Sequence, residues 1–533
     1  MKRWSFLIVA FLLVLSVVTA ALAEGETANA AKIGKTEYAT LDEAVAVAQD
    51  NDTIELLADC TTAGLNLSKN LTIKGKHTVT FTEFGIALWG KKLAFEDCTV
   101  VMNGIGSTPY TAEWNWMTIC ASKDSELSLK NVTMTLDGLG ADGQSIDKHA
   151  IYFCGNDKLS LENSTLTIQN YKQDALEWDG GDGGYNFTLK DSKFRSDKCR
   201  SGITGTFTVK AESSSVEVVN SLGNGSNGSH FELIDSTVNF SDNAAHGLSA
   251  GTLYVERTTI TANRNGANGV HTSSTLTVKD HSEIEITENG CTISSQWTIP
   301  GALHVGGGES TVDGTSTVTI QNNRGSGILL KAGSLTVADG AQLTVTNNVA
   351  EKLGYGGGVN VRGALSLPAG TVLYNNHAGT AGDDIYSSET GSVAFGKVGS
   401  NWVLDDCGHR ITGWFYDGYR MENDAKDASR WNVSGCIAEL PEYIHAFGPE
   451  ERYSAAGVLA LKAAHGIVPV ATPEPTPGPT GSGSTIIAGT PTPAPIPLDP
   501  PTTGDEGGFG LYLAAAAGAA LLMLALVFRK KEG

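Results

Sequence analysis

Short runs in which apolar and polar residues alternate recur along most of the chain, and this pattern predicts β-strands. Leu127-Ser-Leu-Lys-Asn-Val-Thr-Met-Thr-Leu and Leu159-Ser-Leu-Glu-Asn-Ser-Thr-Leu-Thr-Ile show the unit, in which two strands flank a polar turn. Further units begin at Phe187, Phe231, Leu253, Leu276, Ser310, Leu335 and Leu365. Because alternate residues of a strand point to one face, each unit has an apolar face to bury against its neighbours.

A third short strand is predicted ahead of most units, at Ala150-Ile151, Ala175-Leu176, Gly202-Ile203, Gly247-Leu248, Gly269-Val270, Gly327-Ile328 and Gly358-Val359. Three strands per unit, with units about 22–35 residues apart, are typical of one turn of a right-handed parallel β-helix. Asn pairs such as Asn322-Asn323 close several units, and Asn suits sharp turns because it tolerates the left-handed conformation. The sequence therefore predicts an all-β solenoid.

Both ends of such a solenoid need caps, because an open end exposes apolar side chains and unpaired strand edges. Thr40-Leu-Asp-Glu43 is a capping box that predicts a short amphipathic helix through Ala48. Residues from 399 onward interrupt the repeat and are rich in aromatic side chains. We therefore expect a β-helix with its N-terminal cap over residues 24–398 and a C-terminal cap region over residues 399–468.

The first residues predict export. Lys2 and Arg3 precede an apolar run, and Ala21-Leu22-Ala23 supplies a small-x-small cleavage site, so residues 1–23 are expected to be a signal peptide. An uncleaved N-terminal membrane anchor is the alternative. The apolar run is short for a full span, which favours cleavage.

The last residues predict anchoring. Residues 469–499 hold much of the proline and are expected to form a disordered, extended linker. Residues 500–533 contain Pro500-Pro501-Thr502-Thr503-Gly504, an apolar stretch long enough for a transmembrane helix and a basic tail, and together these resemble a sortase sorting signal. The resemblance implies that a sortase transpeptidase reads Pro501, Thr503 and Gly504, cuts after Thr503 and joins the chain to cell-wall peptidoglycan. Pro500 departs from the commonest first residue, Leu, so the sortase class stays open, and a permanent single-span protein is the alternative.

The net charge of the chain narrows the classes of molecule that it can bind. The formal net charge is −21, which argues against nucleic acid or anionic lipid as a partner and fits a self-repelling display protein.

Eight cysteines in an exported chain permit disulfides. Cys407 and Cys436 flank one segment and are the candidate pair. The repeat separates Cys60 from Cys98 by two coils, too far for a bridge, whereas Cys120 and Cys154 fall at the same phase of adjacent coils, where they could meet.

The coils also carry a resemblance to a known family. The Tyr38-Ala-Thr-Leu-Asp-Glu-Ala-Val opening, Asp52-Thr-Ile-Glu-Leu and the stacked repeats resemble pectate-lyase-like β-helix surface proteins of Firmicutes, over nearly all of residues 32–466. The segment from Asn376 to Tyr386 is similar to the last coil of adhesin-like members. The resemblance implies architecture more than activity, because the fold hosts lyases, hydrolases, esterases and adhesins.

Polar side chains gather at one phase of the early coils, around the third strand. Alignment places His149, Asp174 and His246 in one column with Ser201, and Lys148 and Arg200 beside it. Related lyases hold Ca²⁺ with carboxylates and use Arg or Lys as base, while hydrolases use paired carboxylates. The candidate catalytic residues are Asp174, Glu177, His149, Lys148, Arg200 and His246; the candidate Ca²⁺ ligands are Asp179 and Asp182; the candidate sugar-contact residues are Trp114, Trp116 and Tyr152.

Two functions are compatible with these features. The leading hypothesis is a secreted, cell-wall-anchored, adhesin-like β-helix that binds glycans or the surfaces of host or neighbouring cells. The alternative is a wall-attached polysaccharide lyase or glycoside hydrolase acting in a groove on the early coils. The sequence calls for no cofactor other than Ca²⁺ in the second case.

Overall fold

The computed structural model describes residues 29–105, 117–180, 184–290, 301–350, 354–368 and 370–395, and four further strands between residues 413 and 464. The chain divides into two units, Met1–Val470 and Ala471–Gly533, and all described residues lie in the first. The signal peptide, linker, sorting signal and transmembrane segment predicted above lie outside the described residues. Among those that are described, no helix has the length and apolar character needed to cross a membrane.

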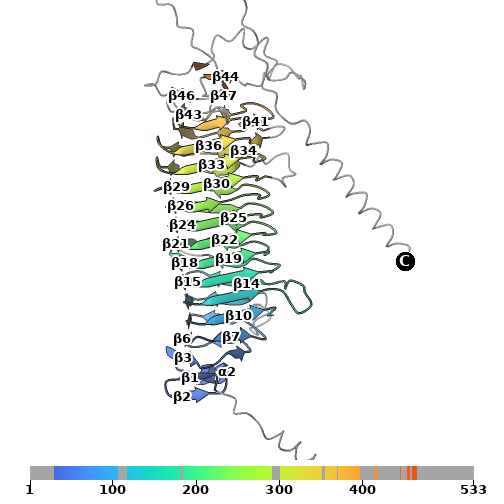
Figure 1. Cartoon of the computed structure of the whole chain (residues 1–533), viewed down its shortest axis with the longest axis vertical. Helices are drawn as coiled ribbons and strands as arrows, with labels where there is room; N and C mark the ends of the chain where they lie inside the picture. Colours follow the sequence, from blue (N-terminus) through green and yellow to red (C-terminus); the bar gives the residue numbers. More distant parts are fainter. Residues whose placement is uncertain are drawn as a thin grey trace, which may run out of the picture. The chain divides into compact units, whose positions relative to one another are not determined.

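Three parallel sheets run along the stack of coils (Figure 1). Sheet 1 contains β3 (Asp52–Leu56), β6 (Leu71–Lys74), β9 (Lys92–Glu96), β12 (Glu126–Lys130), β15 (Lys158–Glu162), β18 (Tyr185–Lys190), β21 (Thr208–Glu212), β24 (Ser229–Ile234), β26 (Leu248–Glu256), β29 (Leu276–Lys279), β32 (Glu309–Val312), β35 (Ser334–Val337), β39 (Ala364–Leu367) and β43 (Ser392–Phe395). Sheet 2 contains β4 (Cys60–Thr62), β7 (Thr78–Phe81), β10 (Thr99–Asn103), β13 (Thr133–Asp137), β16 (Thr165–Gln169), β19 (Lys193–Asp197), β22 (Ser215–Val219), β25 (Thr237–Ser241), β27 (Thr259–Thr261), β30 (Glu283–Thr287), β33 (Thr317–Gln321), β36 (Gln342–Thr346) and β40 (Val372–Tyr374).

Sheet 3 carries the predicted third strands. It contains β5 (Leu65–Leu67), β8 (Ile86–Trp89), β11 (Met117–Ser122), β14 (His149–Cys154), β17 (Leu176–Asp179), β20 (Ile203–Gly205), β23 (Ser226–Asn227), the start of β26, β28 (Val270–Thr272), β31 (Gly301–Val305), β34 (Ser326–Leu330), β38 (Val359–Val361) and β42 (Ile385–Ser387). Each of the seven predicted third strands is confirmed. The long strand β26 pairs with both β28 and β29, so from β26 onward the third strands are continuous with sheet 1.

The core fills the inside of the coils. In sheet 1, Leu127 lies opposite Leu159, which lies opposite Phe187, and all three side chains are fully buried. This register places inward apolar side chains of one coil over those of the next, so the core is continuous along the coils. The prediction of a stacked parallel β-solenoid is therefore confirmed, and its right-handed sense stays a prediction.

Antiparallel strands close both ends of the described stack. β1 (Ala31–Ile33) pairs with β2 (Thr36–Tyr38) and with β3, the first strand of sheet 1. Next to them lies α2 (Leu41–Val47), where Thr40 Oγ1 accepts a hydrogen bond from Glu43 N at 3.1 Å, as the capping box predicts. At the other end, β47 (Leu459–Ala464) pairs with β42 and β44 (Gly413–Tyr416), β46 (Tyr453–Ala456) pairs with β43, and β45 (Ile444–His445) pairs with β44. A further parallel pair joins β37 (Val349–Ala350) to β41 (His377–Ala378).

The Asn pairs form the turns expected of them. Asn322, Asn347 and Asn375 adopt positive φ angles of 58°, 56° and 53°. The second Asn of each pair is buried, and its side-chain amide donates to the equivalent side chain of the next coil: Asn323 Nδ2 to Asn348 Oδ1 at 2.8 Å, and Asn348 Nδ2 to Asn376 Oδ1 at 3.0 Å. This amide ladder therefore satisfies polar groups that the stacking would otherwise bury unpaired.

Five cysteines lie in the described chain, and all five are free thiols: Cys60, Cys98, Cys120, Cys154 and Cys199. The exclusion of a Cys60–Cys98 bridge is confirmed. Cys120 and Cys154 lie on the paired strands β11 and β14 and pack in one apolar cluster, as predicted, although Cys120 lies directly opposite Tyr152, two residues before Cys154. Cys407 and Cys436 lie outside the described residues.

Candidate functional site

Sheet 3 brings most of the predicted early-coil residues together. Ile151 on β14 lies opposite Leu176 on β17, which lies opposite Ile203 on β20. His149, Asp174 and Ser201 each come two residues before one of these positions, so they stack in one column, as predicted. The column forms because the inward apolar residues fix the register of the paired strands.

Around Asp174 these side chains form an early cluster, defined here as His149, Asp174, Glu177, Arg200 and Thr204. Arg200 donates from Nε to Asp174 Oδ1 at 2.9 Å and from Nη2 to Oδ2 at 2.5 Å, while Thr204 Oγ1 donates to Oδ2 at 3.3 Å. Because Asp174 is only 2% exposed, its negative charge is stabilised by this bidentate ion pair with Arg200 and hardly by water. The hydrogen bond from Arg200 to Asp174 raises the pKa of the Arg200 guanidinium.

His149 lies between the two carboxylates of the cluster. Its Nδ1 is 2.7 Å from Glu177 Oε2 and 3.8 Å from Asp174 Oδ2. The three ligand-type atoms all lie within 4.8 Å of one another, and among the described residues this is the one group of three or more His, Cys, Asp or Glu side chains with such spacing. The arrangement can hold a proton between imidazole and carboxylate, or a metal ion among the three.

Lys148 precedes His149 at the edge of the early cluster. Burial lowers the pKa of its ammonium group, and the neighbouring Asp147 opposes that effect. Asp147 itself accepts a hydrogen bond from Gln173 Nε2 at 2.6 Å, which joins two successive coils.

His246 lies in the predicted column, two coils beyond Ser201, and therefore outside the early cluster. An additional coil with β23 intervenes, and Asn224 occupies the column position next to Ser201 there. This coil has the two-residue strand Ser226–Asn227, which has no apolar alternation to reveal it. His246 instead begins a histidine ladder, with ring centroids 6.0 Å from His271, which is 4.5 Å from His304.

Hydrogen bonds orient the rings of the histidine ladder. Asn268 N donates to His246 Nδ1 at 3.3 Å, and Ser249 Oγ lies 3.0 Å from His271 Nδ1. Burial, followed by the charges of the neighbouring histidines and Lys331, lowers the pKa of His271 and of His304 to about 4. Both imidazoles are therefore neutral at pH 7.

The remaining predicted site residues are dispersed or fall outside the described residues. Asp179 is exposed and accepts a hydrogen bond from the Tyr152 hydroxyl at 3.2 Å. Tyr152 is only 7% exposed, and burial raises the pKa of its phenol, so little of its ring faces solvent. Asp182, Trp114 and Trp116 lie outside the described residues. Trp178 packs between Phe153 and Phe207 in the core.

A second polar region on sheet 3 continues from the histidine ladder into the late coils. The sequence patterns had not predicted this region. We call His271, His304, Lys331 and Arg362 the late basic strip. Lys331 and Arg362 are exposed, and neither forms an ion pair within the part of the chain that the structure describes. The charged side chains that influence His304 are all basic: His271, Lys331, His246 and Arg362. The signal in the sequence was the recurrence of His, Lys and Arg at successive third strands.

Beyond this strip, two tyrosines offer an aromatic surface. The rings of Tyr355 and Tyr386 lie 4.5 Å apart, and Tyr386 is partly exposed. Burial raises the pKa of the Tyr386 phenol, with Arg362 opposing and Glu389 adding to the effect. Aromatic faces beside hydrogen-bonding groups are common at binding surfaces.

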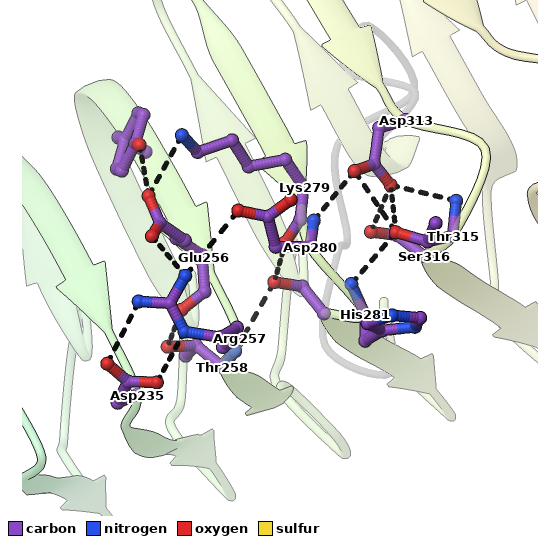
Figure 2. A network of polar contacts seen from close by, with 12 residues as sticks. Asp235, Glu256, Arg257, Thr258, Lys279, Asp280, His281, Asp313, Thr315 and Ser316 are labelled. Atoms are coloured by element: carbon purple, nitrogen blue, oxygen red, sulfur yellow. Dashed lines mark hydrogen bonds and ion pairs between the residues drawn. The ribbon is translucent and has the colours of Figure 1, made fainter.

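An extended network of charged side chains lies on sheet 1, and unlike the late basic strip its cations are paired with carboxylates. Figure 2 shows Arg257 between Asp235 and Asp280, with Lys279 against Glu256 at 2.9 Å. Further along, Asp280 N donates to Asp313 Oδ2 at 2.7 Å. Here every cation faces carboxylates of its own or adjacent coils, so the network links coils and leaves no surplus charge for a ligand.

A hollow of about 310 Å³ also lies on sheet 1, away from both regions of sheet 3. Its lining residues are Lys92, Asp124, Ser125, Glu126, Asn156 and Lys158. Lys92 is paired with Glu126 at 3.0 Å, which again leaves the charges of this region balanced. The polar groups of sheet 3 are therefore the stronger candidates for a functional surface.

Comparison with known protein families and with curated proteins gave no match. Among solved structures, the crystal structure of the periplasmic alginate epimerase AlgG is 10% identical, covers 62% of this chain and 81% of its own, and has a TM-score of 0.30. A point mutant of that epimerase is also 10% identical, covers 55% and 80%, and has a TM-score of 0.28. The topology of the chain itself therefore defines its class, an all-β protein of stacked parallel coils.

Proposed function

We propose that this protein is exported, attached to the cell wall, and binds anionic polysaccharides along sheet 3. The signal peptide and the sorting signal in the sequence support display outside the cell, with a sortase and peptidoglycan as partners. The proposal keeps the adhesin-like function expected from the sequence. It adds sheet 3 as the binding surface and anionic polysaccharides as the class of ligand.

The late basic strip is the observation that carries this proposal. The net charge of the whole chain is −21, so the average surface repels a polyanion. On sheet 3, in contrast, Lys331 and Arg362 are exposed without ion-pair partners in the described chain, next to His304. Arg suits bidentate binding of carboxylates, and Lys adds a point charge.

The geometry of the strip suits an extended polymer. His271 lies opposite His304, and Leu330 lies opposite Val361, so Lys331 and Arg362, one residue further on, occupy equivalent places in successive coils. Adjacent parallel strands are about 4.8 Å apart. A row of donors at this spacing can contact successive groups of one glycan chain, whereas a small ligand would use only one coil.

Affinity electrophoresis tests the proposal. We expect the purified protein to be retarded by hyaluronan or polygalacturonate and not by neutral dextran, and the retardation to weaken with salt. Lys331→Ala/Arg362→Ala should weaken binding at least about tenfold, because two charged contacts are lost.

Lys130→Ala/Lys190→Ala is the matched control, since it removes the same charge from exposed positions on sheet 1. An equal loss of affinity in both double variants would mean that binding depends on net charge alone. Retention of the protein by neutral dextran, or an unchanged affinity of the sheet 3 variant, would contradict the proposal.

Catalysis by the early cluster is the second candidate, favoured by the convergence of His149 on two carboxylates. In a lyase, His149 or Glu177 would accept the proton next to the uronate carboxylate while the glycosidic C–O bond breaks and the leaving sugar takes its oxygen; in a hydrolase, one carboxyl group would protonate the leaving oxygen and the other would activate water. Incubation with a panel of uronate and neutral glycans tests this, by ultraviolet absorbance of unsaturated products and by reducing ends. Turnover that Glu177→Gln abolishes would establish an enzyme, and binding without turnover would exclude it for these substrates.

A further inference from the structure

The early cluster has the donor set of a transition-metal site. His149 offers an imidazole nitrogen, and Asp174 and Glu177 offer one carboxylate oxygen each, from two adjacent coils. Three protein ligands with one open position are the usual arrangement of a catalytic zinc ion. Ca²⁺ prefers six to eight oxygen ligands, so a nitrogen-containing set of three favours a smaller, softer cation.

The distances agree with this donor set. Ligands that lie about 2.1 Å from a tetrahedral ion are about 3.4 Å from one another. The distances from His149 Nδ1 to Glu177 Oε2 and to Asp174 Oδ2, 2.7 and 3.8 Å, lie on either side of that value. The three ligand atoms all lie within 4.8 Å of one another, so side-chain rotations that part Nδ1 from Oε2 and release Asp174 Oδ2 from Arg200 Nη2 would bring them to coordination distance.

The burial of the three side chains and the groups around them also fit a metal site. His149 and Asp174 are 8% and 2% exposed, so solvent competes weakly, while the Glu177 side chain is 31% exposed and leaves an access side. Arg200 Nε holds Asp174 Oδ1 at 2.9 Å, which is the usual role of a group behind a metal ligand, while Arg200 Nη2 and Thr204 Oγ1 contact Oδ2, the oxygen that faces His149. The positive charge of Arg200 also offsets part of the anionic charge of the site.

We propose that His149, Asp174 and Glu177 bind one divalent transition-metal ion, of the Zn²⁺ or Mn²⁺ kind. The site is separate from the late basic strip, and the proposal holds whether or not the protein binds polysaccharides. The side chains come from β14, β17 and the turn before β17, so the ion would also connect two coils.

Metal titration tests the proposal. After the purified protein has been stripped with a chelator, we expect isothermal titration with ZnCl₂ or MnCl₂ to give one equivalent of binding. We also expect the bound ion to raise the melting temperature by several degrees, because it binds the folded chain only. CaCl₂ should bind at least tenfold more weakly.

Glu177→Gln and His149→Ala should each lower the metal affinity at least tenfold. Asp179→Asn is the matched control, since Asp179 is a carboxylate on the same strand that is not among the three ligands. Melting curves without metal establish that each variant is folded, and the nearly isosteric Glu177→Gln keeps the test valid if His149→Ala unfolds. A stoichiometry well below one, tighter binding of Ca²⁺, or equal affinity in Glu177→Gln and Asp179→Asn would overturn the proposal.

Discussion

Single side chains decide how tightly neighbouring coils are joined, and the buried amides are the clearest case. Asn348 accepts hydrogen bonds from the backbone N and from Nδ2 of Asn323, at 3.1 and 2.8 Å. It donates from Nδ2 to Ile320 O at 3.1 Å and to Asn376 Oδ1 at 3.0 Å. One buried residue therefore connects three coils through the donors and acceptors of its side-chain amide.

Replacement of Asn348 by Ala should lower the free energy of unfolding by about 2–4 kcal/mol, because buried groups of Asn323 and Asn376 lose their partners. Urea denaturation followed by circular dichroism measures the change. Asn347→Gly is the control, since Asn347 is exposed and has a positive φ that Gly adopts readily. A loss no larger than that of the control would show that the ladder contributes little.

At the level of the strand, the histidine ladder of sheet 3 makes stability depend on pH. His271 and His304 have pKa values lowered to about 4, chiefly by burial, whereas the ordinary value is about 6.5. Between these values the unfolded chain takes up protons that the folded imidazoles do not. Protonation thus favours unfolding, and the stability contributed by the neutral ladder is lost as the pH falls from about 6.5 towards 4.

We expect the melting temperature to fall as the pH is lowered from 7 to 4.5, and to fall less in His271→Asn/His304→Asn. Thermal unfolding at a series of pH values measures this. His281→Asn, at an exposed turn, should keep the dependence of the parent chain. A parallel decline in the parent and the ladder variant would assign the acid sensitivity to other groups.

The same strands show how far sequence patterns reach. Apolar alternation predicts the three-strand coils, because inward residues such as Leu127 and Leu159 must be buried in any solenoid. It predicts the association of His149 with Asp174 as well, because the register of the core fixes their column. It fails at Ser226–Asn227, where hydrogen bonds of small polar residues replace apolar alternation, so the additional coil between Ser201 and His246 was not predicted. Contacts such as that of Arg200 with Asp174 depend on side-chain conformations that no repeat pattern specifies.

At the level of the whole molecule, the ends of the stack govern its association. β42 and β43 would offer open edges if β46 and β47 did not pair with them in antiparallel orientation. Asp384 strengthens that closure, since its Oδ2 accepts a hydrogen bond from Ala463 N on β47 at 2.8 Å. Open strand edges and bare apolar coils are templates for other chains.

A chain that ends after residue 395 should therefore form dimers or larger assemblies, whereas one that ends after residue 470 should stay monomeric. Size-exclusion chromatography with light scattering distinguishes them. A monomeric and fully folded shorter chain would mean that the last coil needs no cover. The comparison also tests the predicted C-terminal cap, most of which lies outside the described residues.

The amide ladder has a direction that bears on how such a protein can change in length. Each Asn donates to the oxygen of the next coil, and Asn376 donates to Asp384 Oδ1 at 3.0 Å. Asp384 ends the ladder, because both of its oxygens accept hydrogen bonds, Oδ1 from Asn376 and Oδ2 from Ala463 N. Duplication of a complete Asn-bearing coil before Asp384 would preserve every donor and acceptor, whereas a coil added after it would begin with a broken chain. The molecule can therefore lengthen by internal duplication while its last coil stays the same, which lets evolution extend the exposed face without redesigning the end.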